Sequence, residues 1–200
     1  MKNARNSTEK NSRYEIRIAG SGGQGIILAG IILAEAALLD GRYVAQSQSY
    51  GPETRGGNSI SEVILSDTEI DYPQASALDL LVALTQEACD CNLPDMKMAG
   101  LVIVDSDLVN GVPWGRVVSL PFWQIAQRAG EPRAINMAAL GAISSFCPGV
   151  SRHSLAKVMA KRLPSDKVSA NLLAFDEALK LARKLKGSLR TVETKEDLEI

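Results

Sequence analysis

The sequence has few of the residues from which metal and redox centres are built. Its 200 residues include one histidine, His153, and three cysteines, Cys89, Cys91 and Cys147. A structural zinc site needs four ligands, and an iron–sulfur cluster needs four thiolates in a characteristic run. The Cys89–Cys91 pair and the distant Cys147 match neither pattern. We therefore expect no metal ligands in this chain and three reduced thiols.

The chain also lacks a strong charge of either sign and a membrane-length apolar run. Its formal net charge is −1, which gives no reason to expect binding to nucleic acid or to a membrane surface. The longest apolar run, residues 26–39, contains Gly30 and Glu35 and is too short to span a bilayer. Residues 1–12 are polar and do not resemble a signal peptide, so we expect a cytoplasmic protein.

What the sequence does contain is a regular alternation of apolar strands and helices. We predict strands over residues 14–19, 42–47, 58–65, 78–84, 100–104 and 116–120, with a short edge strand at 70–72. We predict helices over residues 26–39, within 85–98, and over 121–129, 137–143, 154–163 and 167–186. This order predicts an α/β fold with a Rossmann-like, mostly parallel sheet, helices on both faces and a helical C-terminal third. The stretch 58–72 is expected to add antiparallel strands.

The domain organisation follows from the same pattern. We expect residues 1–12 to be a disordered tail and residues 13–190 to form a single α/β domain. Residues 191–200 are charged, and we expect them to be a frayed tail.

A glycine-rich turn, Gly20-Ser21-Gly22-Gly23-Gln24-Gly25, lies between the first strand and the first helix. This context suits an anionic group, because glycines allow close backbone approach and the following helix N-terminus carries free N–H groups. Nicotinamide cofactors need an acid near the end of the second strand, and that strand ends in Ala45-Gln46-Ser47-Gln48. The turn is also no P-loop. Two interpretations stay open: an anion site, such as one for a phosphate of a large cofactor, or a turn that only permits close packing.

A second loop, Tyr50-Gly51-Pro52-Glu53-Thr54-Arg55-Gly56-Gly57, follows the second strand, where open α/β sheets form their ligand crevice. Arg55 is its only basic residue, and an arginine between glycines can present its guanidinium to a phosphate. It could equally be a solvated side chain in a connecting turn. Glu53 is interpreted as an exposed loop glutamate.

Together with Asn136-Met137-Ala138-Ala139-Leu140-Gly141-Ala142, these two loops resemble the gamma subunit of 2-oxoacid:ferredoxin oxidoreductases. The similarity runs from about residue 13 to residue 185, and the pattern is nearest to the 2-oxoglutarate type, with pyruvate and branched-chain types related. The resemblance implies a complex that oxidatively decarboxylates a 2-oxoacid, forms the acyl-coenzyme A and reduces ferredoxin.

The resemblance implies that this chain has a non-catalytic role in the complex. Thiamine diphosphate and iron–sulfur clusters would lie in partner alpha, beta and ferredoxin-like delta subunits, and coenzyme A would be a substrate of the complex. This subunit would be structural and would help to form the coenzyme A region. The residues that match the family there are Gly22, Gly23, Gln24, Gly25, Tyr50, Arg55 and Asn136. The sequence has no thiamine diphosphate signature and no nucleophile–base pair, so no catalytic residue is assigned.

Several residues allow two interpretations. Asn136 precedes an apolar helix and is a natural N-cap, whereas the resemblance places it near a subunit contact or the cofactor crevice. His153 suits a surface or capping role. The nearly all-apolar helix 26–39 should be covered on both sides, so the isolated chain could form a homodimer.

A stand-alone nucleotide-binding redox sensor is the alternative function, and an independent small-molecule enzyme is a third. A sensor would need a basic DNA-binding element, and an enzyme would need a catalytic constellation; neither is found in the sequence.

Overall fold

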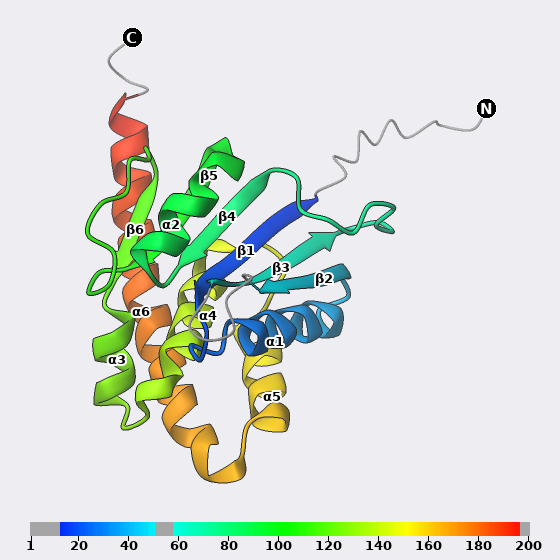
Figure 1. Ribbon diagram of the computed structural model, residues 1–200, viewed down its shortest axis with the longest axis vertical. Helices are drawn as coiled ribbons and strands as arrows, with labels where there is room; N and C mark the ends of the chain where they lie inside the picture. Colours follow the sequence, from blue (N-terminus) through cyan, green and yellow to red (C-terminus); the bar gives the residue numbers. More distant parts are fainter. Residues whose placement is uncertain (1–12, 51–57, 197–200) are drawn as a thin grey trace, which may run out of the picture.

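The computed structural model describes residues 13–50 and 58–196, with side chains up to residue 187 (Figure 1). Six strands form one sheet in the order β2-β3-β1-β4-β5-β6. The strands are β1 (Tyr14–Ser21), β2 (Tyr43–Tyr50), β3 (Asn58–Ser66), β4 (Leu78–Ala83), β5 (Met96–Asp105) and β6 (Val117–Leu120).

The sheet is mixed, but five of its strands run in one direction. β1, β4, β5 and β6 pair in parallel, whereas β3 is antiparallel to both of its neighbours, β1 and β2. The predictions of a mostly parallel sheet and of an antiparallel strand beginning at Asn58 are therefore confirmed. β3 lies between β1 and β2 because the chain leaves β2 at the edge and returns beside β1.

The predicted edge strand at residues 70–72 is wrong, because no strand forms between β3 and β4. Side chains satisfy the backbone around this segment instead. Arg13 donates hydrogen bonds to the carbonyl oxygens of Tyr72 and Gln74, at 2.9 and 2.8 Å. The Glu15 carboxylate accepts hydrogen bonds from the backbone N–H groups of Ser76 and Ala77, at 2.7 and 3.0 Å. Because these backbone groups already have partners, the segment needs no strand ladder.

The helices are α1 (Ile26–Leu39), α2 (Gln86–Asn92), α3 (Phe122–Arg128), α4 (Ile135–Phe146), α5 (Arg152–Arg162) and α6 (Ser165–Glu196), with short 3₁₀ turns η1 (Leu93–Asp95) and η2 (Pro132–Ala134). The chain is helical after η2, as predicted, and α6 continues ten residues beyond its expected end near residue 186. Among the described residues, no helix is long and apolar enough to cross a membrane.

The helices are distributed unequally over the two faces of the sheet. The main core contains buried residues of α1, α3, α4, α5 and α6, whereas the second cluster contains α2 and the segment before β6. The expectation of helices on both faces is therefore correct, but five helices cover one face and only α2 covers the other among the described residues. The reason is that α4, α5 and α6 all follow the last strand and pack on the face that α1 already covers (Figure 1).

Two glycines allow this face to pack closely. A Cβ on Gly30 of α1 would lie 1.9 Å from Ser61 Oγ of β3, and a Cβ on Gly141 of α4 would lie 2.1 Å from the carbonyl oxygen of Phe175 in α6. Glycine is therefore needed where α1 crosses β3 and where α4 meets α6.

The opposite face carries a buried polar network centred on Arg17 of β1. Its guanidinium is ion-paired with Glu62 at 2.6 Å and with Asp95, and it donates to Asn92 Oδ1 at 2.9 Å. The Arg17 residue is 9% exposed, so these partners satisfy a cation that burial would otherwise penalise.

Candidate functional site

The glycine-rich turn connects β1 to α1 and is held together by Gln24. The Gln24 side chain accepts a hydrogen bond from the N–H of Ser21 at 2.8 Å, and a Cβ on Gly20 would lie 2.4 Å from Gln24 Oε1. Gly23 has a φ of +91°, and no atom lies within 4 Å of where its Cβ would be. The requirement for glycine is thus steric at Gly20 and conformational at Gly23.

Asn136 joins this turn from the other end of the sequence. Its Nδ2 donates a hydrogen bond of 3.0 Å to the carbonyl oxygen of Gly25, and the Asn136 residue is 4% exposed. Gly25 has a φ of +73°, and a Cβ there would lie 2.3 Å from Asn136 Nδ2. Only glycine combines this backbone conformation with so close an approach.

The predicted N-cap role of Asn136 is therefore wrong. α4 begins at Ile135 with Ala134 in the cap position and no side-chain cap. The 3₁₀ turn η2 leads directly into the helix. The backbone N–H of Arg133 in this turn donates a hydrogen bond to the Glu131 carboxylate at 3.4 Å. With capping supplied one turn earlier, the Asn136 side chain is available for Gly25.

The second loop begins and ends beside the glycine turn, at the end of the sheet where β1 and β2 finish and β3 begins. Asn58 pairs with Ser21, and Tyr50 pairs with Ser59, which in turn pairs with Gly20. β2 is two strands away from β1, and neighbouring strands lie about 4.8 Å apart, so Tyr50 lies about 10 Å from the turn. Tyr50 is 66% exposed.

Two residues of that loop, Glu53 and Arg55, lie outside the described residues. The position of the loop is therefore known only from its two flanking residues, Tyr50 and Asn58.

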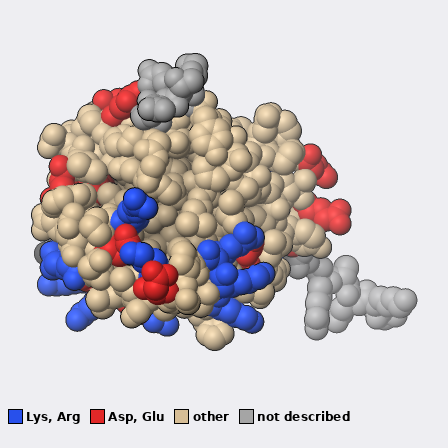
Figure 2. Space-filling view, turned by 60° about the horizontal axis from the view of Figure 1, so that its bottom comes forward, with Lys and Arg blue, Asp and Glu red and all other residues tan. Residues whose placement is uncertain are grey.

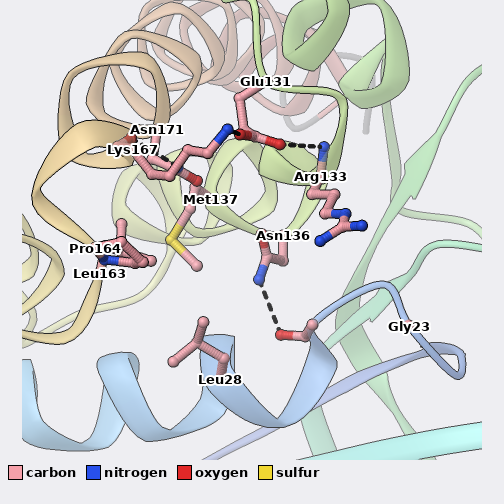
Figure 3. A pocket seen from close by; sticks show the side chains of 11 residues that line it. Gly23, Leu28, Glu131, Arg133, Asn136, Met137, Leu163, Pro164, Lys167 and Asn171 are labelled. Carbon is pink, nitrogen blue, oxygen red and sulfur yellow. Dashed lines mark hydrogen bonds and ion pairs between the residues drawn. The ribbon is translucent and has the colours of Figure 1, made fainter.

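A pocket of about 560 Å³ opens above the start of α1 (Figure 3). Figure 3 shows that α1, η2, α4 and the start of α6 contribute its walls. It is lined by Gly23, Gly25, Leu28, Glu131, Arg133, Asn136, Met137, Leu163, Pro164, Lys167 and Asn171. One wall is apolar, and the other presents an amide, a guanidinium and the N-terminus of α1.

The charges around the pocket are not all equally available. Lys167 forms an ion pair with Glu131 at 2.6 Å, and the Lys167 hydrogen bond is the main reason that the pKa of the Glu131 carboxyl is lowered. The Arg133 guanidinium makes no hydrogen bond or ion pair with the described residues, and in Figure 3 it extends beside Asn136. α1 adds the positive end of its dipole, with no side-chain cap at Gly25. The pocket is therefore suited to an anion.

Several cations lie near this end of the molecule. Figure 2 shows Lys and Arg side chains over the lower part of this face, interspersed with Asp and Glu side chains. α5 contributes Lys157, Lys161 and Arg162, and the start of α6 contributes Lys167.

The remaining candidate residues lie elsewhere. Cys89 and Cys147 are buried and Cys91 is exposed, and all three are free thiols. His153 is exposed in the first turn of α5, whose N-cap is Ser151. No group of three or more His, Cys, Asp or Glu side chains arranged to hold a metal ion occurs within the described ranges.

Comparison with known proteins gives the family. The model of the family described as pyruvate ferredoxin/flavodoxin oxidoreductase matches residues 15–181. The chain belongs to this family. It is 42% identical over 186 residues to the 2-oxoglutarate synthase subunit KorC of Methanocaldococcus jannaschii, a match that covers 90% of this chain and 100% of that relative.

Solved structures agree with this membership. The keto/oxoacid ferredoxin oxidoreductase gamma subunit from Geobacter sulfurreducens is 44% identical, with a TM-score of 0.75 over 84% of this chain and 98% of that one. A 2-oxoglutarate:ferredoxin oxidoreductase from Magnetococcus marinus, solved with 2-oxoglutarate, coenzyme A and succinyl-CoA, is 27% identical with a TM-score of 0.76. That match covers 88% of this chain and 32% of the longer chain.

The family confirms the resemblance to gamma subunits of 2-oxoacid:ferredoxin oxidoreductases that the three motifs indicate. The chain is a subunit of such a complex, so partner subunits are implied. A stand-alone redox sensor is not favoured.

The sequence did not indicate the three charged residues of the pocket, which are Glu131, Arg133 and Lys167. The motif containing Asn136 begins only three residues after Arg133, so the position of that arginine just before α4 was an available signal. No local signal indicates Lys167, which reaches the pocket only because α6 packs against η2.

Proposed function

We propose that this chain is the gamma subunit of a 2-oxoglutarate:ferredoxin oxidoreductase and that it contributes part of the coenzyme A region of that complex. The substrate is proposed from the relatives, several of which are named 2-oxoglutarate synthase subunits. Alpha, beta and ferredoxin-like delta subunits would supply thiamine diphosphate and the iron–sulfur clusters, and would pass electrons to ferredoxin.

One observation carries the coenzyme A part of the proposal. The glycine turn and the two ends of the second loop lie where β1 and β2 end and β3 begins, and Asn136, up to 116 positions away in the sequence, contacts the turn. Asn136 is bonded directly to the turn, and the pocket beside it offers a guanidinium that no described residue binds. Coenzyme A combines phosphates with a long uncharged arm that carries methyl, methylene and amide groups, and the pocket offers a guanidinium, amide side chains and an apolar wall.

Within this proposal the residues have different tasks. Gly23 and Gly25 let the backbone approach the ligand, and the N-terminus of α1 stabilises negative charge. Asn136 positions the turn. Arg133 and Arg55 are the proposed phosphate ligands, because guanidinium groups form paired, charge-assisted hydrogen bonds with phosphate. The Glu131–Lys167 ion pair joins η2 to α6 and holds the rim of the pocket.

The test is a coenzyme A titration of the assembled complex with 2-oxoglutarate and ferredoxin. A partly shielded arginine–phosphate contact contributes about 1.5–3 kcal/mol to the binding free energy. Arg133→Ala and Arg55→Ala should therefore each raise the half-saturating coenzyme A concentration roughly ten- to a hundredfold. The 2-oxoglutarate requirement should stay unchanged. Arg152→Ala is the matched control, since Arg152 is paired with Asp176 on the surface and does not line the pocket.

Unshifted coenzyme A curves for both variants would rule out the arginine assignments. A complex that oxidises pyruvate or 2-oxoisovalerate faster than 2-oxoglutarate would overturn the substrate assignment, and would leave the coenzyme A assignment standing.

A further inference from the structure

β2 is an edge strand that lacks the usual protection of sheet edges. It pairs with β3 on one side only and has no partner strand on the other within the described residues. Every second residue of such a strand directs its N–H and C=O groups outward. Its sequence, Tyr43-Val44-Ala45-Gln46-Ser47-Gln48-Ser49-Tyr50, contains no charge and no proline. Natural edge strands are usually blocked by charges or proline, or by a bulge or a short length.

α1 adds an apolar stripe above this edge. Ile27 and Ile31 are half-buried and Leu38 is 57% exposed, and their spacing of four and seven residues places them on one flank. Ile32 and Ala36 of the same helix are completely buried, and Leu38 borders a groove that Lys157, Val158 and Lys161 of α5 also line. The expectation that the whole helix is covered is therefore met on one flank only. In Figure 1, α1 and β2 lie together at the border of the molecule.

We propose that two copies of this chain associate through this surface. In this dimer, β2 pairs antiparallel with β2 of the second copy around a dyad perpendicular to the sheet, so that two six-stranded sheets become continuous. The stripe Ile27, Ile31 and Leu38 packs against the same stripe of the second copy. The proposal does not depend on the coenzyme A site.

The geometry favours a second copy over an unrelated strand. α1 packs on β3 and β2, so its axis lies about 5–7 Å from a dyad that runs beside β2, given strands about 4.8 Å apart. The two α1 helices are then about 10–14 Å apart, and a helix with its side chains is about 10–12 Å across. A copy therefore brings a matching apolar helix to the uncovered stripe.

The two elements also have matching centres. α1 spans about 21 Å and β2 about 26 Å, and the chain reverses direction between them. A dyad near Gln46, in the middle of β2, then passes close to the middle of α1. Leu38 would face Ile27 of the other copy, and Ile31 would lie close to the dyad.

The charges of the segment are compatible with self-association. From Ile26 to Tyr50 there are three charged residues, and each is bound within its own chain. Glu35 pairs with Arg162, Asp40 accepts hydrogen bonds from Ser151 and Ser154, and Arg42 pairs with Asp67 at 2.6 Å. Pairing through residues 26–50 therefore brings no unbound charges of that segment together, and the nearest other charges beside Leu38 are Lys157 and Lys161 of α5.

The test is the mass of the full chain in solution, measured by sedimentation and light scattering between about 1 and 100 µM. We expect a dimer for the native chain. Leu38→Lys in the stripe and Gln48→Lys on the exposed part of β2 should each raise the dissociation constant at least tenfold. Leu173→Lys is the matched control, because Leu173 of α6 is 54% exposed and lies outside the surface; it should leave the dimer unchanged.

Thermal unfolding of each variant verifies that the chain still folds. A native chain that stays monomeric at 100 µM overturns the proposal, as does a dimer that neither lysine weakens. A third result also overturns it: a monomeric chain whose Leu38→Lys variant fails to join the oxidoreductase subunits. In that case the surface belongs to a different subunit.

Discussion

Asn136 Nδ2 donates a 3.0 Å hydrogen bond to the carbonyl oxygen of Gly25, joining residues 111 positions apart. This bond connects the start of α4 to the turn that begins α1. Asn136→Ala removes one of two donors to this carbonyl, which still accepts the Ala29 N–H at 3.0 Å, so we expect the free energy of unfolding to fall by about 0.5–1.5 kcal/mol. Chemical denaturation of the isolated chain measures this change.

Asn136→Asp sharpens the same test. The aspartate has nearly the same shape but places a carboxylate oxygen against the Gly25 carbonyl, so it should destabilise the chain more than alanine does at neutral pH. Equal stability of the aspartate variant and the native chain would show that the bond contributes nothing.

Gly141 should tolerate no larger residue, because α4 and α6 touch there. In Gly141→Ala the new methyl would lie 2.1 Å from the Phe175 carbonyl oxygen, and separating the helices should cost about 1–3 kcal/mol. Gly187→Ala is the contrasting variant, since no atom beyond its own helix backbone lies within 4 Å of its Cβ position; it should stabilise α6 by about 0.5–1 kcal/mol. Thermal melts of both variants test the opposite signs, and a stabilising Gly141→Ala would refute the packing.

The Glu131–Lys167 ion pair should give stability a pH dependence of known sign. Its hydrogen bond lowers the pKa of Glu131 and raises that of Lys167. A lowered carboxyl pKa contributes stability above the unfolded value, and this contribution is lost as the pH falls through the folded value. Glu131→Gln should therefore be less stable than the native chain at pH 7, and the difference should shrink as the pH falls below the ordinary pKa range of a glutamate carboxyl. Unfolding midpoints across this range measure it; a difference independent of pH would show that the pair is energetically silent.

The cysteines should differ in reactivity. Burial raises the pKa of the Cys147 thiol to about 12 and also raises that of Cys89, whereas Cys91 is exposed. Alkylation requires the thiolate and access to it. We expect one thiol to react rapidly in the native chain at pH 8, none in Cys91→Ser, and three in denatured native-sequence chain. Rapid modification of two or more native thiols would contradict the burial of Cys89 and Cys147.

Much of the fold can be predicted from local patterns. The helix over Ile26–Leu39 has the predicted bounds, because an apolar run interrupted only by Gly30 and Glu35 lies between Gly25 and Gly41. Most strands of the sheet overlap the predicted apolar runs, although β2 is largely polar and β5 begins four residues before its predicted start, and the three motifs by themselves indicate the family. The segment 70–72 is no strand because Arg13 and Glu15, both distant in sequence, satisfy the backbone of its neighbourhood.

The sequence by itself therefore determined the elements, the glycine requirement of the β1–α1 turn and the family. Only the tertiary structure decided what those elements bring together. Asn136 looks like a helix cap in isolation, and it contacts Gly25 only because α4 packs beside α1. Lys167 joins the pocket through Glu131 for the same reason. Local propensity acts over a few residues, whereas these contacts depend on how helices pack on one face of the sheet, and that packing is fixed by the whole core at once.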